Sequence, residues 1–186
     1  MDKLINLRID WAADGTAGVT LSRNKEKLFS GPLKGYGSPG AGAGVYTADL
    51  NADGLPDYAI LTHSGGCGLA SQAAWITFLL SVRGGYSSIC VLCWDAEPTD
   101  FLKIKGRLYL VHTSFIQGNT GKDGKSHNYW VYSLLGFSGT TLTLANENDR
   151  RFPKWVWYTF APNHRDADQL TAVQRQVSLK QILELD

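Results

Sequence analysis

Segment 49–57, which reads Asp-Leu-Asn-Ala-Asp-Gly-Leu-Pro-Asp, holds four closely spaced oxygen-bearing side chains. Oxygen side chains stand at its positions 1, 3, 5 and 9, glycine at position 6 and a free carbonyl at position 7. Ca²⁺ binds six to eight oxygens at about 2.3–2.6 Å, and alternate residues of a curled loop can face one ion. Gly54 permits the sharp turn, and three carboxylates in one loop would repel one another without a cation. The predicted calcium ligands are Asp49, Asn51, Asp53, the carbonyl of Leu55 and Asp57.

This loop is not an EF-hand. An EF-hand has a bidentate Glu at position 12, on the following helix. Position 12 here is Ile60, inside the β-patterned run 58–61, so the loop is expected to lead into a strand. The alternative is a hairpin turn rich in Asp and Asn that holds no metal, because both residues favour turns on their own.

Residues 44–61 resemble one FG-GAP (VCBS-type) repeat, the calcium-loop unit of integrin-like propellers and of many exported bacterial proteins. The resemblance implies Ca²⁺ held by the five residues named above, at the start of a strand in an exported binding protein. That family usually repeats the loop, and a propeller needs at least about four blades, which one clear copy cannot supply. A fainter copy at 10–21 has Asp10, Asp14 and Gly15 in register, but Ala12 and Gly18 replace two ligands, so an ordinary turn is expected there.

A second kind of chemistry would centre on Cys67, which glycines flank, with His63 or His112 as its base. The alternative function is therefore a small hydrolase or thiol enzyme, although no distinctive nucleophile motif surrounds this cysteine. Cys90 and Cys93 complete the three cysteines, and their odd spacing sends them to opposite faces of a strand. A disulfide from Cys67 to one of them would suit an oxidising compartment.

Two further site types are disfavoured. A zinc site needs paired ligands, and the four histidines are scattered singly. The string Gly-x-Gly-x-x-Gly at 35–40 has neither the strand before it nor the helix after it that a dinucleotide site requires. We therefore expect no catalytic residues and no cofactor apart from Ca²⁺.

Most of the predicted secondary structure around this loop is strand. Short β-branched or aromatic runs bounded by turn residues predict strands at 58–63, 75–82, 88–94, 108–115, 129–135 and 140–144. An aromatic strand at 155–160 is expected to pack in the core. Hairpin turns are predicted at 83–86, 121–125 and 136–139, so sequential strands should pair antiparallel.

Two segments differ from this pattern. Residues 31–44 hold six glycines and two prolines, which predicts a Gly-rich loop without secondary structure. Residues 171–185 begin with a capping box and then repeat apolar residues at helical spacing, which predicts a C-terminal helix. The fold class is thus α+β, a mainly antiparallel sheet of about eight strands with one helix, in a single domain over residues 1–186.

Composition limits the function. With 186 residues, 44% hydrophobic and 19% charged, the chain is globular. The net charge of +1 gives no basic field for nucleic acid, and the longest apolar run, 73–80, is too short to span a membrane. Residues 1–8 carry no signal-peptide pattern.

The predicted function is a non-catalytic calcium-binding protein, in which Ca²⁺ stabilises a binding or interaction module. A site of this kind is filled where Ca²⁺ is millimolar, so a periplasmic or extracellular location is expected. The partner is an unknown protein or carbohydrate ligand. Trp94, Trp130 or Trp155 could contact a carbohydrate or peptide.

Overall fold

The computed structural model describes residues 5–37, 43–94, 96–120, 124–145, 156–159 and 168–169. These residues form three antiparallel sheets and two short 3₁₀ helices, η1 (Gly68–Gln72) and η2 (Pro98–Asp100). The predicted β-rich, antiparallel character is therefore confirmed. The predicted helix at 171–185 lies outside the described residues.

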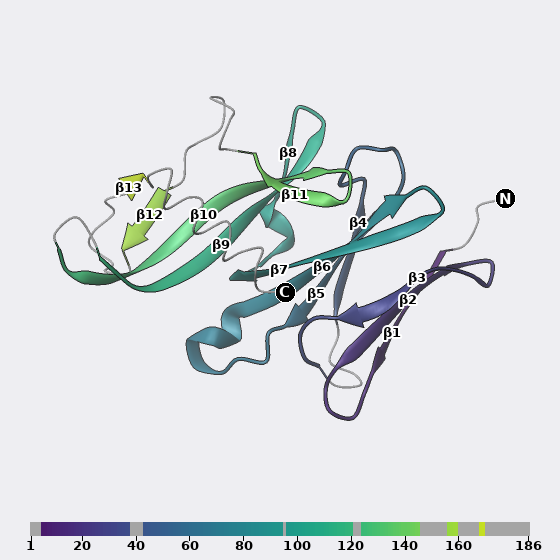
Figure 1. Ribbon diagram of the computed structural model, residues 1–186, viewed down its shortest axis with the longest axis horizontal. Helices are drawn as coiled ribbons and strands as arrows, with labels where there is room; N and C mark the ends of the chain where they lie inside the picture. The colour runs from purple at the N-terminus through teal and green to yellow at the C-terminus, as the bar shows by residue number, and fades with distance from the viewer. Residues whose placement is uncertain are drawn as a thin grey trace.

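The structure has three sheets, and the middle one lies between the other two (Figure 1). The N-terminal sheet has the order β1 (Ile5–Trp11), β2 (Ala17–Arg23), β3 (Glu26–Leu33). The middle sheet has the order β4 (Gly44–Ala48), β5 (Asp57–His63), β6 (Ala73–Val82), β7 (Gly85–Trp94). The C-terminal sheet contains β8 (Phe101–Ile104), β9 (Arg107–Thr120), β10 (Ser126–Ser138), β11 (Thr141–Leu144), β12 (Val156–Thr159) and β13 (Asp168–Gln169).

The central strand β6 of the middle sheet is buried on both faces. On one face Phe78 and Leu80 pack with Leu135 and other residues of the C-terminal sheet. On the opposite face Leu79 packs with Val19 and other residues of the N-terminal sheet. Successive residues of a strand point to opposite faces, so β6 needs apolar residues at nearly every position. This double burial explains the long apolar run at 73–80.

The predicted strands of the middle sheet are confirmed, and they extend a few residues further than predicted. The turn between β6 and β7 is the pair Arg83 and Gly84, because Val82 pairs with Gly85. The third predicted turn is displaced: residues 136–138 continue β10, and the chain turns at 139–140.

The predicted Gly-rich loop at 31–44 is wrong at both ends. Gly31 pairs with Val19 inside β3, and Gly44 begins β4. β3 is an edge strand, and proline is tolerated there because its backbone nitrogen, which has no hydrogen to donate, can face away from the neighbouring strand. Composition indicated a loop at these positions because glycine and proline are rare in central strands. The β1–β3 sheet itself was not among the predicted strands.

Candidate metal centre

The loop 49–57 connects the two strands of the β4–β5 hairpin, which closes where Ala48 pairs with Asp57. The chain takes left-handed backbone angles at Ala52, with φ of 62°, and at Gly54, with φ of 82°. Left-handed residues curl the chain tightly, and glycine adopts such angles without strain. The curled loop predicted from the spacing is therefore present.

Asp57, the last residue of the motif, is fully buried. Its Oδ1 accepts hydrogen bonds from the Ser81 N–H at 2.7 Å and from the Ser81 hydroxyl at 2.8 Å. Its Oδ2 accepts from the N–H groups of Leu50 at 2.7 Å and Asn51 at 3.2 Å. Hydrogen bonds to an ionised group are among the strongest in proteins, and they offset the loss of hydration of a buried carboxylate. Asp57 therefore holds the loop backbone against the middle sheet.

The other oxygen side chains fold back onto the loop. Asp49 accepts the N–H of Asp53 on Oδ1 and the N–H of Gly54 on Oδ2, each at 3.0 Å. The Asn51 side-chain oxygen accepts from the same Asp53 N–H at 3.2 Å. The side chains at positions 1 and 3 are thus drawn to one nitrogen in the loop, which brings their oxygens together.

Asp53 links the loop to β6. Its Oδ2 accepts the Ser81 hydroxyl at 2.7 Å, and its Oδ1 accepts the Leu55 N–H at 2.8 Å. The Ser81 hydroxyl, followed by the Leu55 N–H, lowers the pKa of Asp53 below its usual value. Asp53 is therefore ionised at neutral pH.

One serine hydroxyl lies between two carboxylates. The Ser81 oxygen is within hydrogen-bond distance of both Asp53 and Asp57, yet a hydroxyl has only one proton to donate. Asn51 Nδ2 adds a bond to the Ser81 carbonyl at 3.3 Å, and the Tyr86 hydroxyl donates to the Pro56 carbonyl at 2.9 Å. The loop is thus fastened to the β6–β7 hairpin by residues far away in the sequence.

Sequence reasoning missed Ser81 and Tyr86. Ser81 is a polar residue near the end of the apolar run of β6, and this interruption was the one available signal. Its partner could not be identified without the register of β5 against β6.

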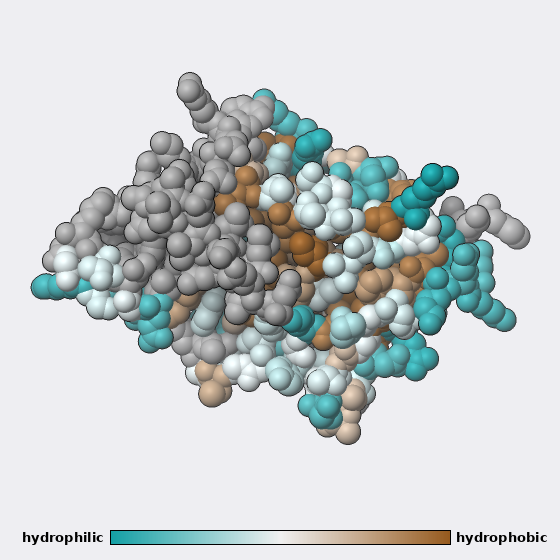
Figure 2. All heavy atoms as spheres, in the orientation of Figure 1, coloured by the Kyte–Doolittle hydropathy of each residue, from teal (hydrophilic) through white to brown (hydrophobic). Residues whose placement is uncertain are grey.

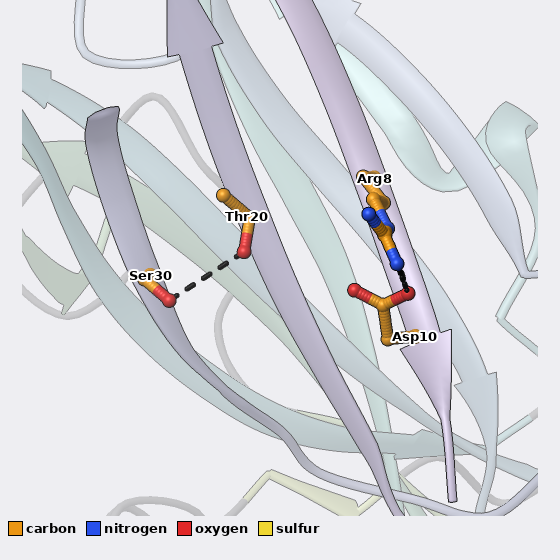
Figure 3. A network of polar contacts seen from close by, with 4 residues as sticks. All are labelled: Arg8, Asp10, Thr20 and Ser30. Carbon is orange, nitrogen blue, oxygen red and sulfur yellow. Dashed lines mark hydrogen bonds and ion pairs between the residues drawn. The ribbon is translucent and has the colours of Figure 1, made fainter. Parts of the chain in front are cut away.

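The three carboxylates of the loop have no cationic partner within the described residues. The ion pair that the described residues do form joins Arg8 to Asp10 at 2.7 Å, on the N-terminal sheet and not on the loop (Figure 3). Across all the described residues, no three His, Cys, Asp or Glu side chains are grouped as they would be around a metal ion.

The donors of the loop nevertheless have the chemistry that Ca²⁺ prefers. Asp49 and Asp53 offer carboxylates, Asn51 an amide oxygen and Leu55 a carbonyl, all of them hard oxygen ligands. Asp57 differs because it is fully buried and its carboxylate accepts four hydrogen bonds, whereas Asp49 and Asp53 are exposed. The loop therefore fits the ion in donor type, with Asp57 on its buried side.

The fainter motif near the N-terminus forms an ordinary turn. Asp14 accepts hydrogen bonds from the N–H of Thr16 at 3.0 Å and from its hydroxyl at 2.7 Å. These bonds lower the pKa of Asp14. Gly15 adopts φ of 84° between β1 and β2, as a hairpin turn requires.

The proposed thiol chemistry is not assembled by the described residues. Among their hydrogen bonds, none joins the exposed Cys67 to His63 or His112. His112 is a buried residue of β9, and burial lowers its pKa to about 4. Its Nε2 lies 2.7 Å from the Leu92 carbonyl, which can only accept, so Nε2 carries the proton. His112 is therefore neutral at pH 7.

Cys67, Cys90 and Cys93 form no disulfide with one another. Cys93 lies in the core between the middle and C-terminal sheets, whereas Cys90 is half-buried and accepts a hydrogen bond from Thr77. As predicted from their odd spacing, Cys90 and Cys93 point to opposite faces of β7. Of the three tryptophans considered for ligand binding, Trp94 is half-buried with its ring centroid 5.5 Å from that of Phe115. The side chains of Trp130 and Trp155 lie outside the described residues.

No helix within the described residues has the length and apolarity to cross a membrane. Comparisons with known protein families, curated proteins and solved structures find no match to this chain.

Proposed function

We propose that the loop 49–57 binds Ca²⁺ and that the ion stabilises a non-catalytic binding module. The observation that supports this most is the set of three carboxylates in nine residues with no cationic partner among the described residues. Two of these carboxylates share one serine hydroxyl, so their charges lie close together. A divalent cation would relieve the repulsion between them.

The direct ligands in this proposal are Asp49, Asn51, Asp53 and the Leu55 carbonyl. Asp57, which the motif also marks as a ligand, would hold the loop backbone through its four hydrogen bonds. The ion would thereby fix the start of β5 against the end of β6. We attribute no reaction to the site.

The module is proposed to act outside the cytosol, where Ca²⁺ is abundant enough to fill such a loop. Its ligand would be a protein or a carbohydrate. A site filled to about 100 times its Kd would add about 2.7 kcal/mol to the free energy of unfolding.

Thermal unfolding of chelator-treated protein, with and without Ca²⁺, tests the proposal. Ca²⁺ should raise Tm, whereas Mg²⁺ at equal ionic strength should raise it much less. Asp53→Ala should remove the Ca²⁺ response. Asp14→Ala is the matched control, because Asp14 also caps an exposed turn and also has a lowered pKa.

Two outcomes would reject the calcium site. One is a parent protein whose Tm does not respond to Ca²⁺. The other is an Asp53→Ala variant that responds as strongly as the parent.

A further inference from the structure

Strand β4 is an open edge of the middle sheet. It pairs with β5 on one side, and no described strand pairs with its other side. The opposite edge of this sheet, β7, lies against β9 and β3. An open edge presents a row of free N–H and C=O groups that can pair with another chain.

β4 also lacks the features that usually protect an edge. Its sequence, Gly-Val-Tyr-Thr-Ala, contains no charge and no proline. Three other edge strands carry such residues: β1 has Arg8 and Asp10, β3 has Glu26, Lys27 and Pro32, and β8 has Lys103. Charges and prolines at edges prevent pairing between chains, so their absence from β4 leaves pairing open.

The β4 edge exposes hydrophobic side chains on both of its faces. Val45 is 43% exposed and Tyr46 is 40% exposed. Tyr46 borders an apolar cavity of about 180 Å³ that Leu50, Ala59 and Phe101 also line. Figure 2 shows hydrophobic residues reaching the surface in the region where Figure 1 places β4 and β8.

We infer that β4 pairs antiparallel with β4 of a second copy of this chain, joining two middle sheets into one. The strand has five residues, so a two-fold axis through its centre places Tyr46 opposite its own counterpart. Val45 then faces Thr47 of the other copy. Directly opposed aromatic pairs are favourable in antiparallel sheets.

The charge distribution permits a second copy as the occupant. The acidic loop 49–57 begins immediately after Ala48, so antiparallel pairing places the acidic loops of the two copies at opposite ends of the paired strands. At about 3.4 Å per residue the five-residue strand spans more than a Debye length of about 8–10 Å, and the loops repel each other little. The net charge of +1 adds almost no repulsion between whole chains.

Sedimentation velocity of the full chain, from micromolar to the highest attainable concentration, tests this inference. We expect a reversible monomer–dimer equilibrium. Tyr46→Lys should weaken the dimer by about tenfold or more, because it places two like charges opposite each other. Leu102→Lys is the matched control, since Leu102 is 41% exposed on the neighbouring edge strand β8 and should leave the equilibrium unchanged.

A disulfide cross-link between two copies tests the register. The variant used places a small, uncharged residue at the centre of β4. Tyr46→Cys in a Cys67→Ser background should form a disulfide-linked dimer under mild oxidation, because opposed Cα atoms in an antiparallel pair lie about 4.5–5.5 Å apart. Ser30→Cys in the same background, exposed on β3, should remain uncross-linked.

The inference is overturned if the parent stays monomeric at every concentration, which would leave the β4 edge to a different chain. It is also overturned if Leu102→Lys weakens the dimer as much as Tyr46→Lys, or if Ser30→Cys cross-links as readily as Tyr46→Cys. None of these measurements depends on Ca²⁺ binding, so they remain informative whether or not the calcium proposal holds.

Discussion

Asp57 and Ser81 are hydrogen-bonded to each other twice, although 24 residues separate them in the sequence. Asp57 begins β5 and Ser81 lies near the end of β6, so the two bonds close the end of this strand pair. The same carboxylate also accepts two N–H groups of the acidic loop. The shape of the loop therefore depends on the sheet behind it as well as on its own turn residues.

Asp57→Asn should destabilise the protein by about 3 kcal/mol, even without any metal, because an amide nitrogen would face N–H donors inside the fold. Urea unfolding in the presence of a chelator measures this loss. Asp53→Asn is the comparison, because Asp53 is exposed and its substitution should cost less than about 1 kcal/mol under the same conditions. Equal losses in the two variants would show that Asp57 has no special structural role.

Ser81→Ala removes the hydroxyl between the two carboxylates but keeps the N–H bond to Asp57. We expect a loss of about 1 kcal/mol in the free energy of unfolding. The pKa of Asp53 should rise toward its ordinary value, because the Ser81 hydroxyl is the main cause of its lowering. Carbon-detected NMR titration of the Asp53 carboxyl measures that shift.

Ser30→Ala is the control for this change. The Ser30 hydroxyl lies 3.5 Å from that of Thr20 on the exposed face of the N-terminal sheet (Figure 3). Its removal should change stability by less than about 0.5 kcal/mol. An Asp53 pKa that is the same in Ser81→Ala and in the parent would contradict the contact.

Much of the middle sheet could be predicted from the sequence, because its signals are local. The run 75–82 ends at the Arg83–Gly84 turn, and a two-residue hairpin fixes the pairing of β6 with β7. The turn chemistry of the acidic loop was predictable for the same reason. β3 was not, because Gly31 and Pro32 are typical of loops and are tolerated here only at a sheet edge.

The contacts around the loop could not be predicted, because they depend on register between distant strands. The link between Asp53 and Ser81 spans 28 residues, and that between Pro56 and Tyr86 spans 30. The pattern of the motif places all of its oxygens toward one ion. It does not show that the carboxylate of Asp57 would be buried and would accept hydrogen bonds from Ser81 and from the loop backbone.

Gly35 and Gly54 both have positive φ, at 97° and 82°, but they should respond differently to substitution by alanine. A Cβ at position 35 would collide with the Thr62 hydroxyl and lie 2.6 Å from the His63 carbonyl oxygen, whereas a Cβ at position 54 meets nothing within 4 Å. Gly54→Ala should therefore cost about 1 kcal/mol from backbone strain alone. Gly35→Ala should cost clearly more, because backbone must also move.

Urea unfolding of the two alanine variants measures the difference. If Gly54→Ala proves at least as damaging as Gly35→Ala in the absence of metal, the close packing of residue 35 against β5 is wrong.

His112 should make stability depend on pH in the mildly acidic range. Burial lowers its pKa from 6.5 to about 4, so between these values the unfolded chain binds more protons than the folded protein. The free energy of unfolding therefore falls as pH falls through this window, by at most about 3 kcal/mol, and this contribution is constant above it.

Urea unfolding at several pH values, compared between the parent and His112→Gln, separates the contribution of His112 from that of the carboxylates. Glutamine can still donate to the Leu92 carbonyl but does not titrate, so the variant should show a shallower slope between pH 4 and 6.5. Equal slopes would mean that His112 is not held neutral by burial.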